Sequence, residues 1–192
     1  MGKPIRLYAN APVTITFALL ALAALVLGAV TDGWTTRTLF SVYRAPLSDP
    51  LTWVRMVGHV LGHSGYAHYI GNMMLLLVLG PTLEERYGSG SIAVAIVMTA
   101  LVAGVVQMAC FPGTALLGAS GIVFMMILLS AFGGTPRGRG VPITLLLVGV
   151  LYLGGELWDA IFVRDNISQL SHILGGVCGT VFGFLLTRRG KG

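Results

Sequence analysis

A serine, two histidines and an asparagine stand in stretches of this sequence where polar side chains are costly. Ser120 lies within Gly118-Ala119-Ser120-Gly121, His172 opens an apolar run, and Asn72 follows His68 by four residues. A serine hydroxyl with an imidazole as its base can attack a carbonyl carbon. His68 and Asn72, at positions i and i+4, share one helical face and can supply N–H groups to the oxyanion that forms. These residue types predict acyl transfer, with Ser120 as the nucleophile and His172 as the general base.

The composition is that of a membrane protein. Of the 192 residues, 55% are hydrophobic and 10% are charged, with a mean hydropathy of +0.85, whereas a soluble domain carries about 25% charged residues. This excludes a soluble domain, a coiled coil and a disulfide scaffold. The basic residues flank apolar runs without interleaved aromatics, which indicates lipid headgroups as the partner and no nucleic acid. Cys110 and Cys178 lack metal-ligand spacing, and we interpret both as packing residues.

Apolar segments predict an all-α, polytopic membrane protein: one domain over residues 1–192, a six-transmembrane-helix bundle with a long external first loop. The segments are residues 13–30, 66–79, 92–109, 119–132, 141–163 and 170–186. Because about 20 residues are needed to cross a bilayer, the second and fourth segments are short enough to be re-entrant or buried. Gly80 and Pro81 are expected to close the second helix. The first segment lacks a well-formed cleavage site, so we interpret it as a retained helix.

The positive charges predict the orientation. With a cytoplasmic N-terminus, the inside segments carry Lys3, Arg6, Arg86, Arg137, Arg139, Arg188, Arg189 and Lys191, and the outside segments carry Arg37, Arg44, Arg55 and Arg164. This excess places both termini in the cytoplasm. The loop 31–65 is then external, and its Trp34, Tyr43 and Trp53 suit an interfacial structure.

In this topology the second, fourth and sixth helices all begin near the external surface. The polar residues named above therefore come to rest at one shallow depth. Gly118 and Gly121 flank Ser120, while Gly175 and Gly179 make a flat face one turn after His172. Flat faces of this kind pack closely in membranes, which would bring the hydroxyl within reach of the imidazole.

Each polar residue also has a plainer interpretation. A lone serine in a transmembrane helix usually bonds the carbonyl four residues before it. His59 and His63 could bind a metal, but they lack the glutamate of a His-Glu-x-x-His zinc site, so interfacial or packing histidines are the better interpretation. Glu156 and Asp159 fit a proton path or a water-exposed rim. Only the common depth of the serine and the histidines at the helix starts favours chemistry.

At these residues the sequence resembles the rhomboid family of intramembrane serine proteases, from the first loop to the sixth helix. The family's Gly-x-Ser-Gly stands here as Gly118–Gly121, and its sixth-helix histidine with spaced glycines stands as His172, Gly175 and Gly179. The second-helix pattern of two histidines and an asparagine is His63, His68 and Asn72. The resemblance implies a Ser120–His172 dyad, with His68 and Asn72 lining the oxyanion hole.

Three further positions carry the resemblance or depart from it. Glu84 matches a family glutamate, expected here as a structural residue in the loop after the second helix. Phe124 takes the place of an aromatic, often Tyr, that stacks under the base histidine, and it lacks the hydroxyl. The family's adjacent Trp-Arg pair is here Trp53-Val54-Arg55, which leaves the first-loop structure open.

The resemblance implies an endopeptidase of the compact bacterial type in the inner membrane, without metal or cofactor. Its substrates would be transmembrane proteins whose helix can unwind locally. The fifth helix, interrupted by Gly154 and Gly155, is a candidate gate. One alternative is a catalytically silent rhomboid-like protein that binds transmembrane clients, although such a protein would be expected to have lost the serine or the histidine. A second alternative is a small proton-coupled transporter, but such transporters have paired repeats, which the sequence lacks. No feature of the sequence defines an oligomeric state.

Overall fold

The computed structural model describes residues 8–133, 143, 146, 147, 150, 151, 174–182 and 185. The elements within 8–133 are α1 (Pro12–Val30), α2 (Trp34–Leu39), α3 (Pro50–Gly58), the 3-10 helix η1 (His59–Leu61), α4 (Tyr66–Tyr87), α5 (Ser89–Cys110) and α6 (Ser120–Gly133). Residues 174–182 are also helical. Most of the predicted helix 141–163, including Glu156 and Asp159, lies outside the described residues, and so does His172.

α1 begins where a side chain from a distant helix supplies the missing cap. Pro12 stands at its first position, where the absent N–H costs nothing. The carboxylate of Glu84 accepts hydrogen bonds from the backbone N–H groups of Val13 (3.2 Å) and Thr14 (2.6 Å) and from the Thr14 hydroxyl (2.7 Å). A negative charge at a helix N-terminus also complements the helix dipole. The start of α1 is therefore bound to the end of α4.

The expectation that the second helix ends at residue 79 is wrong, because α4 continues through Gly80 and Pro81 to Tyr87. A side chain at Gly80 would collide with Thr14, so this glycine serves the close approach of α1 and not a helix end. Helices in membranes tolerate an internal proline. At 22 residues α4 is long enough to span a bilayer. The loop position expected for Glu84 is also wrong, because the longer helix carries this residue in its last turn.

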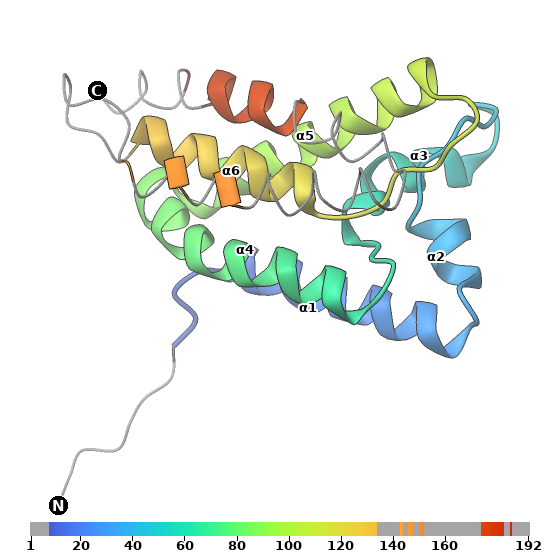
Figure 1. Cartoon of the computed structure of the whole chain (residues 1–192), viewed down its shortest axis with the longest axis horizontal. Helices are drawn as coiled ribbons and strands as arrows, with labels where there is room; N and C mark the ends of the chain where they lie inside the picture. Colours follow the sequence, from blue (N-terminus) through green and yellow to red (C-terminus); the bar gives the residue numbers. More distant parts are fainter. Residues whose placement is uncertain are drawn as a thin grey trace, which may run out of the picture.

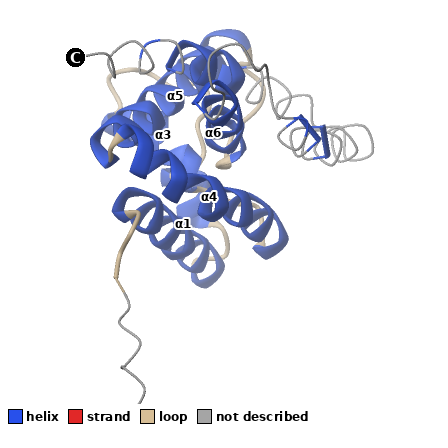
Figure 2. Cartoon of the chain, turned by 90° about the vertical axis from the view of Figure 1, so that its left-hand side faces the viewer, coloured by secondary structure: helices blue, strands red, loops and turns tan. Residues whose placement is uncertain are grey.

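α6 is the central helix of the described bundle. It packs against α4 on one side and α5 on the other, and α1 covers the far side of α4; the two cartoon views show this arrangement (Figures 1 and 2). Ile122, Val123, Met125, Met126 and Leu129 are fully buried. A helix that is apolar all around its circumference belongs in such a position.

The first loop forms a compact structure at one end of the bundle. α2 and α3 lie beside the end at which α4 and α6 begin (Figure 1). α3 packs against α5, where a side chain at Gly104 would stand 2.8 Å from the Met56 carbonyl oxygen. Asp49 caps α3 by accepting the Leu51 N–H at 3.0 Å. Residues far apart in sequence thus converge on the end of the bundle where Ser120 lies.

The outer faces of the helices are apolar. α1 and α5, with 19 and 22 residues, are the described helices that are long and apolar enough to cross a membrane. Large aliphatic side chains such as Leu19, Val26 and Val94 are more than half exposed on them.

Cys178 is buried in the core, as expected, but Cys110 is exposed. The packing interpretation of Cys110 is therefore wrong, because the residue faces outward at the last position of α5.

Candidate active site

Ser120 is the first residue of α6 and is buried, with 5% of its surface exposed. The segment before it is held by a two-residue bridge, in which Val42 N–H donates to the Leu116 carbonyl (2.9 Å) and Leu116 N–H donates to the Val42 carbonyl (2.8 Å). Leu116 is the residue four before Ser120, and it does not belong to a preceding helical turn. The plainer interpretation of Ser120, a hydroxyl bonded to the carbonyl one turn back, therefore does not describe its position. Its neighbours are the N–H groups at a helix start, which have no partner within the helix.

Gly118 shapes the approach to Ser120 and touches the first candidate oxyanion residue. Its φ of +123° is a backbone conformation that side chains disfavour. Its N–H donates to the His59 carbonyl at 2.9 Å. A carbon added at Gly118 would stand 3.0 Å from both Cε1 and Nε2 of His68. The imidazole of His68 therefore lies directly over the backbone two residues before the candidate nucleophile.

His68 and Asn72 lie on the first two turns of α4. The Nδ1 atom of His68 is 3.5 Å from the backbone nitrogen of Ser64 and 3.1 Å from the Ser64 hydroxyl oxygen. Because a backbone N–H can only donate, these contacts favour Nδ1 as the acceptor and the tautomer with its proton on Nε2. Nε2 is one of the two ring atoms nearest Gly118. Asn72 is buried, and its Nδ2 donates to the His68 carbonyl at 3.1 Å.

His59 and His63 are buried beside this pair. His63 Nδ1 is 3.1 Å from the Leu61 carbonyl, and its ring stands edge-on to His68 with 5.0 Å between the centroids. Burial lowers the pKa of His63 to about 4, with a smaller contribution from the neighbouring His68. Burial likewise lowers the pKa of His59 to about 4. Both rings are therefore neutral near pH 7, as buried packing histidines.

Residues 174–182 lie against α6, close to Ser120. A side chain at Gly175 would collide with the carbonyl oxygen of Gly121, and one at Gly179 would collide with that of Met125. One at Gly176 would stand 2.8 Å from the Phe124 ring. Leu174 packs against the small core cluster of Val42, Ala103 and Leu116, which includes the two residues of the bridge before Ser120. The structure thus brings Gly121, Phe124, Gly175 and Gly179 together with Ser120, while His172, two residues before Leu174, lies outside the described residues.

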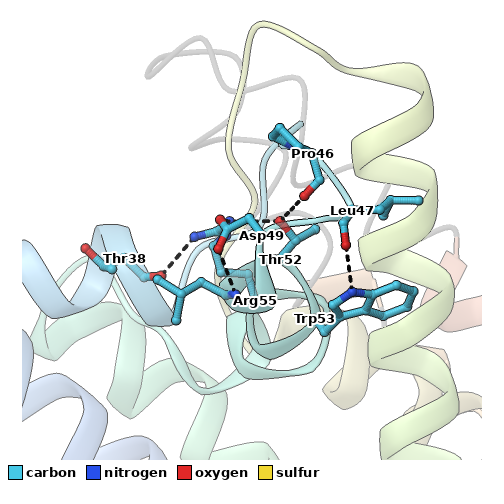
Figure 3. A network of polar contacts seen from close by, with 8 residues as sticks. Thr38, Pro46, Leu47, Asp49, Thr52, Trp53 and Arg55 are labelled. Atoms are coloured by element: carbon cyan, nitrogen blue, oxygen red, sulfur yellow. Dashed lines mark hydrogen bonds and ion pairs between the residues drawn. The ribbon is translucent and has the colours of Figure 1, made fainter.

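The first loop is organised around Arg55, which is 3% exposed (Figure 3). Its Nη2 contacts Asp49 Oδ2 at 2.6 Å and the Thr52 hydroxyl at 3.0 Å. The guanidinium also stands over the Tyr43 ring, 4.7 Å from its centroid. The Arg55 hydrogen bond holds the pKa of Asp49 below its usual range. The tryptophan Trp53 is not adjacent to Arg55 in the sequence. The ion pair between Arg55 and Asp49 nevertheless stabilises the first loop, which carries Val42 and His59.

Two residues of this region were not predicted from the sequence. Ser64 contacts His68, and the only local signal is a polar residue just before a helix whose third position is a histidine. Asp49 pairs with Arg55, and the signal is an aspartate before a proline at a helix start.

Trp34 and Trp53 are more than half exposed on the first loop. Within the described ranges, no three His, Cys, Asp or Glu side chains are grouped closely enough to hold a metal ion.

Comparisons with known proteins add a family to this geometry. The sequence model described as the Rhomboid domain matches residues 50–189. The chain is 31% identical over 137 residues to "Rhomboid protease GlpG" of Serratia proteamaculans (strain 568), covering 70% of this chain and 48% of that protein. It is 26% identical over 180 residues to "Rhomboid protease GlpG" of Yersinia pestis (strain Pestoides F), covering 92% of this chain and 63% of that protein.

A third similar protein is "Rhomboid-related protein 1" of Caenorhabditis elegans, 26% identical over 140 residues, which are 69% of this chain and 39% of that protein. The chain therefore spans roughly half the length of these relatives. The matched range 50–189 contains Ser120, His172, His68 and Asn72. The match and the apolar helices α1 and α5 together identify an integral membrane protein.

Proposed function

The chain belongs to the rhomboid family, and from this premise we propose that it is an intramembrane serine endopeptidase. It hydrolyses a peptide bond in or next to the transmembrane segment of a membrane-protein substrate by a Ser120–His172 dyad. The observation that carries the proposal is the position of Ser120, buried at the first residue of α6, beside a backbone segment on which the His68 imidazole rests. The proposed nucleophile Ser120, the His68 imidazole and the N–H groups at the start of α6 therefore lie close together.

The contacts of residues 174–182 support His172 as the general base. Gly175, three residues after His172, meets the carbonyl of Gly121, the residue that follows Ser120. The contacts run in the same order along both segments, with Gly179 at Met125 and Gly175 at Gly121, so residue 175 is at the Ser120 end of this contact. The Phe124 ring contacts Gly176 and is suited to support the base from below.

The proposed reaction follows the general scheme of serine hydrolysis. The Ser120 oxygen forms a bond to the peptide carbonyl carbon while its proton passes to His172. The carbonyl oxygen becomes an oxyanion, which the Nε2–H of His68 and the amide of Asn72 stabilise together with N–H groups at the start of α6. The C–N bond then breaks, and His172 returns the proton to the leaving amine. Water releases the acyl group from Ser120 by the same steps in reverse.

The location of the site is consistent with a substrate that enters from the membrane. Ser120 is the first residue of α6, and α6 begins at the end of the bundle where α2 and α3 of the first loop lie (Figure 1). A peptide bond inside a helix is shielded, so the substrate must unwind locally, and helix-breaking residues lower the cost of unwinding.

We place both termini in the cytoplasm of a bacterium. Two of the external basic residues are engaged locally, since Arg55 pairs with Asp49 and Arg44 donates to the carbonyls of Met108 and Ala109.

Cleavage of a single-span reporter by the purified protein in detergent tests the proposal. Wild type is expected to cut near the external membrane boundary, while Ser120→Ala and His172→Ala are inert. Loss of one oxyanion donor in His68→Ala should lower the rate by about 10²–10³-fold. Ser130→Ala, a serine at the other end of the same helix, is the matched control and should cleave at the wild-type rate.

Two results would contradict the proposal. Equal cleavage by wild type and Ser120→Ala would show that another residue is the nucleophile. A folded wild type that binds the reporter but does not cut it would favour the client-binding alternative. In that case the motifs would record ancestry without activity.

A further inference from the structure

The start of α4 connects an exposed serine to the candidate oxyanion donor. Ser64 precedes the helix N-cap Gly65, and His68 is the third residue of the helix. The His68 ring turns back toward the N-terminus, so that its Nδ1 is 3.1 Å from the Ser64 hydroxyl and 3.5 Å from the Ser64 nitrogen. A side chain at this helix position that accepts from the residues before the helix resembles the glutamate of a capping box. Here an imidazole occupies the place of the carboxylate.

The direction of these contacts determines the tautomer of the ring. The Ser64 N–H can only donate, and the Ser64 hydroxyl, which can donate or accept, fits as a second donor to the lone pair of Nδ1. A proton on Nδ1 would point at the Ser64 N–H. The tautomer with its proton on Nε2 is therefore favoured. Nε2 is the ring nitrogen that faces Gly118, two residues before Ser120.

A second contact restricts the orientation of the same ring. His63 stands edge-on to His68 at an interplanar angle of 69°, and its own Nδ1 is occupied by the Leu61 carbonyl. His63 is 3% exposed, whereas Ser64 is exposed and contributes nothing to the core. Removal of the Ser64 hydroxyl therefore changes the hold on His68 without opening a cavity.

We infer that Ser64 is a positioning residue for the proposed protease reaction: its hydroxyl holds His68 as the Nε2–H tautomer, with that proton directed at the Gly118–Ser120 segment where the oxyanion forms. The inference rests on the proposed function, because it assigns a purpose to His68 as an oxyanion donor. It adds a residue outside the dyad and the oxyanion pair. Ser64 itself touches no reacting atom.

The first experiment compares kcat and KM for cleavage of the reporter. Ser64→Ala removes the shorter of the two Ser64 contacts, and the loss of one hydrogen bond of about 1 kcal/mol corresponds to a fall in kcat of about 5-fold. KM should stay within about twofold, because the bond acts on the transition state and not on substrate binding. Ser64→Thr keeps the hydroxyl and should restore kcat. Ser48→Ala, which alters another exposed serine of the first loop, should leave both constants unchanged.

The double variant Ser64→Ala/His68→Ala separates positioning from a general structural effect. If Ser64 acts through His68, its replacement should change the residual rate by less than about twofold once the imidazole is absent. An equal fall of about 5-fold in both backgrounds would overturn the inference, and so would an unchanged kcat in Ser64→Ala alone. The melting temperature of each variant shows whether it is folded.

A second readout does not depend on cleavage. The chain contains four histidines, so ¹⁵N-histidine spectra in micelles can assign His68 by its absence in His68→Ala. Wild type and Ser64→Thr should show the Nε2–H pattern. Ser64→Ala should show a mixture of tautomers, because the Ser64 N–H that remains is 3.5 Å from Nδ1 and too long a contact to hold the ring in one tautomer by itself. If wild type does not cleave, the protease proposal fails and these spectra alone decide whether Ser64 holds the ring. A pure Nε2–H pattern in Ser64→Ala would overturn the inference even if wild type is fully active.

Discussion

Glu84 offers the most direct test of how this bundle is held together. Glu84 is 4% exposed, and its carboxylate accepts hydrogen bonds from the Val13 N–H, from the backbone and hydroxyl of Thr14, and from the Ser89 hydroxyl at 2.6 Å. These donors come from the start of α1 and the start of α5. One side chain in the last turn of α4 thus joins three helices.

Replacement of Glu84 by Gln keeps the shape and removes one acceptor oxygen together with the charge. Whichever oxygen becomes the NH₂ group, at least one backbone N–H of α1 loses its acceptor. Hydrogen bonds to a charged group are worth about 1.5–3 kcal/mol each, and the loss of a helix cap costs about 1 kcal/mol. We expect the free energy of unfolding of Glu84→Gln to fall by about 3 kcal/mol, because these contributions overlap. For a chain of this size that corresponds to a melting temperature lower by about 6–12 °C.

Thermal unfolding in detergent, followed by circular dichroism, measures this effect. Glu85→Gln is the matched control, since it makes the same chemical change at the next residue, which is exposed. Thr14→Val should be strongly destabilising in the wild-type background and much less so in the Glu84→Gln background, where the charged acceptor is already absent. If Glu84→Gln melts within about 2 °C of Glu85→Gln, the capping of α1 by Glu84 does not contribute to stability and the reasoning is refuted.

Three further outcomes are expected. Gly175→Ala should destabilise the protein by about 1–3 kcal/mol and lower reporter cleavage, because the new methyl group meets backbone, whereas Gly90→Ala, with open space around it, should not. The pKa of His63 is about 4 in the folded protein and 6.5 ordinarily. Between these two pH values the unfolded chain binds more protons than the folded one, so the free energy of unfolding falls as the pH drops. His63→Gln should reduce the dependence of the free energy of unfolding on pH by up to about 1.4 kcal/mol per pH unit, measured by denaturation at several pH values. Arg55 depresses the pKa of Asp49, so the contribution of that carboxylate to stability is present above its unfolded pKa and is lost at lower pH. The difference in melting temperature between wild type and Asp49→Asn should therefore narrow below about pH 4. A difference that does not change with pH would contradict this prediction.

The hydropathy of the sequence predicted the long helices α1, α5 and α6, but not α2, α3 and η1 of the first loop or the end of α4. The predicted segment 13–30 corresponds to α1, and 92–109 corresponds to α5 with small extensions at both ends. The apolar segment 119–132 predicted a helix start next to Ser120, and α6 begins at that residue. These features depend on neighbours in sequence and on the surrounding solvent, both of which composition and periodicity record.

Tertiary contacts decided the features that the sequence did not reveal. Gly80 and Pro81 resemble a helix end, but the close approach of Thr14 and the capping of α1 by Glu84 favour a helix that continues to Tyr87. The contact of His68 with Gly118 joins two helix starts 50 residues apart in the chain, for which no local pattern exists. Hydropathy reports whether a residue prefers lipid or water, and many packings satisfy that preference equally. Which side chain meets which is determined by the crossing of the helices, and it is known only when the chain is folded.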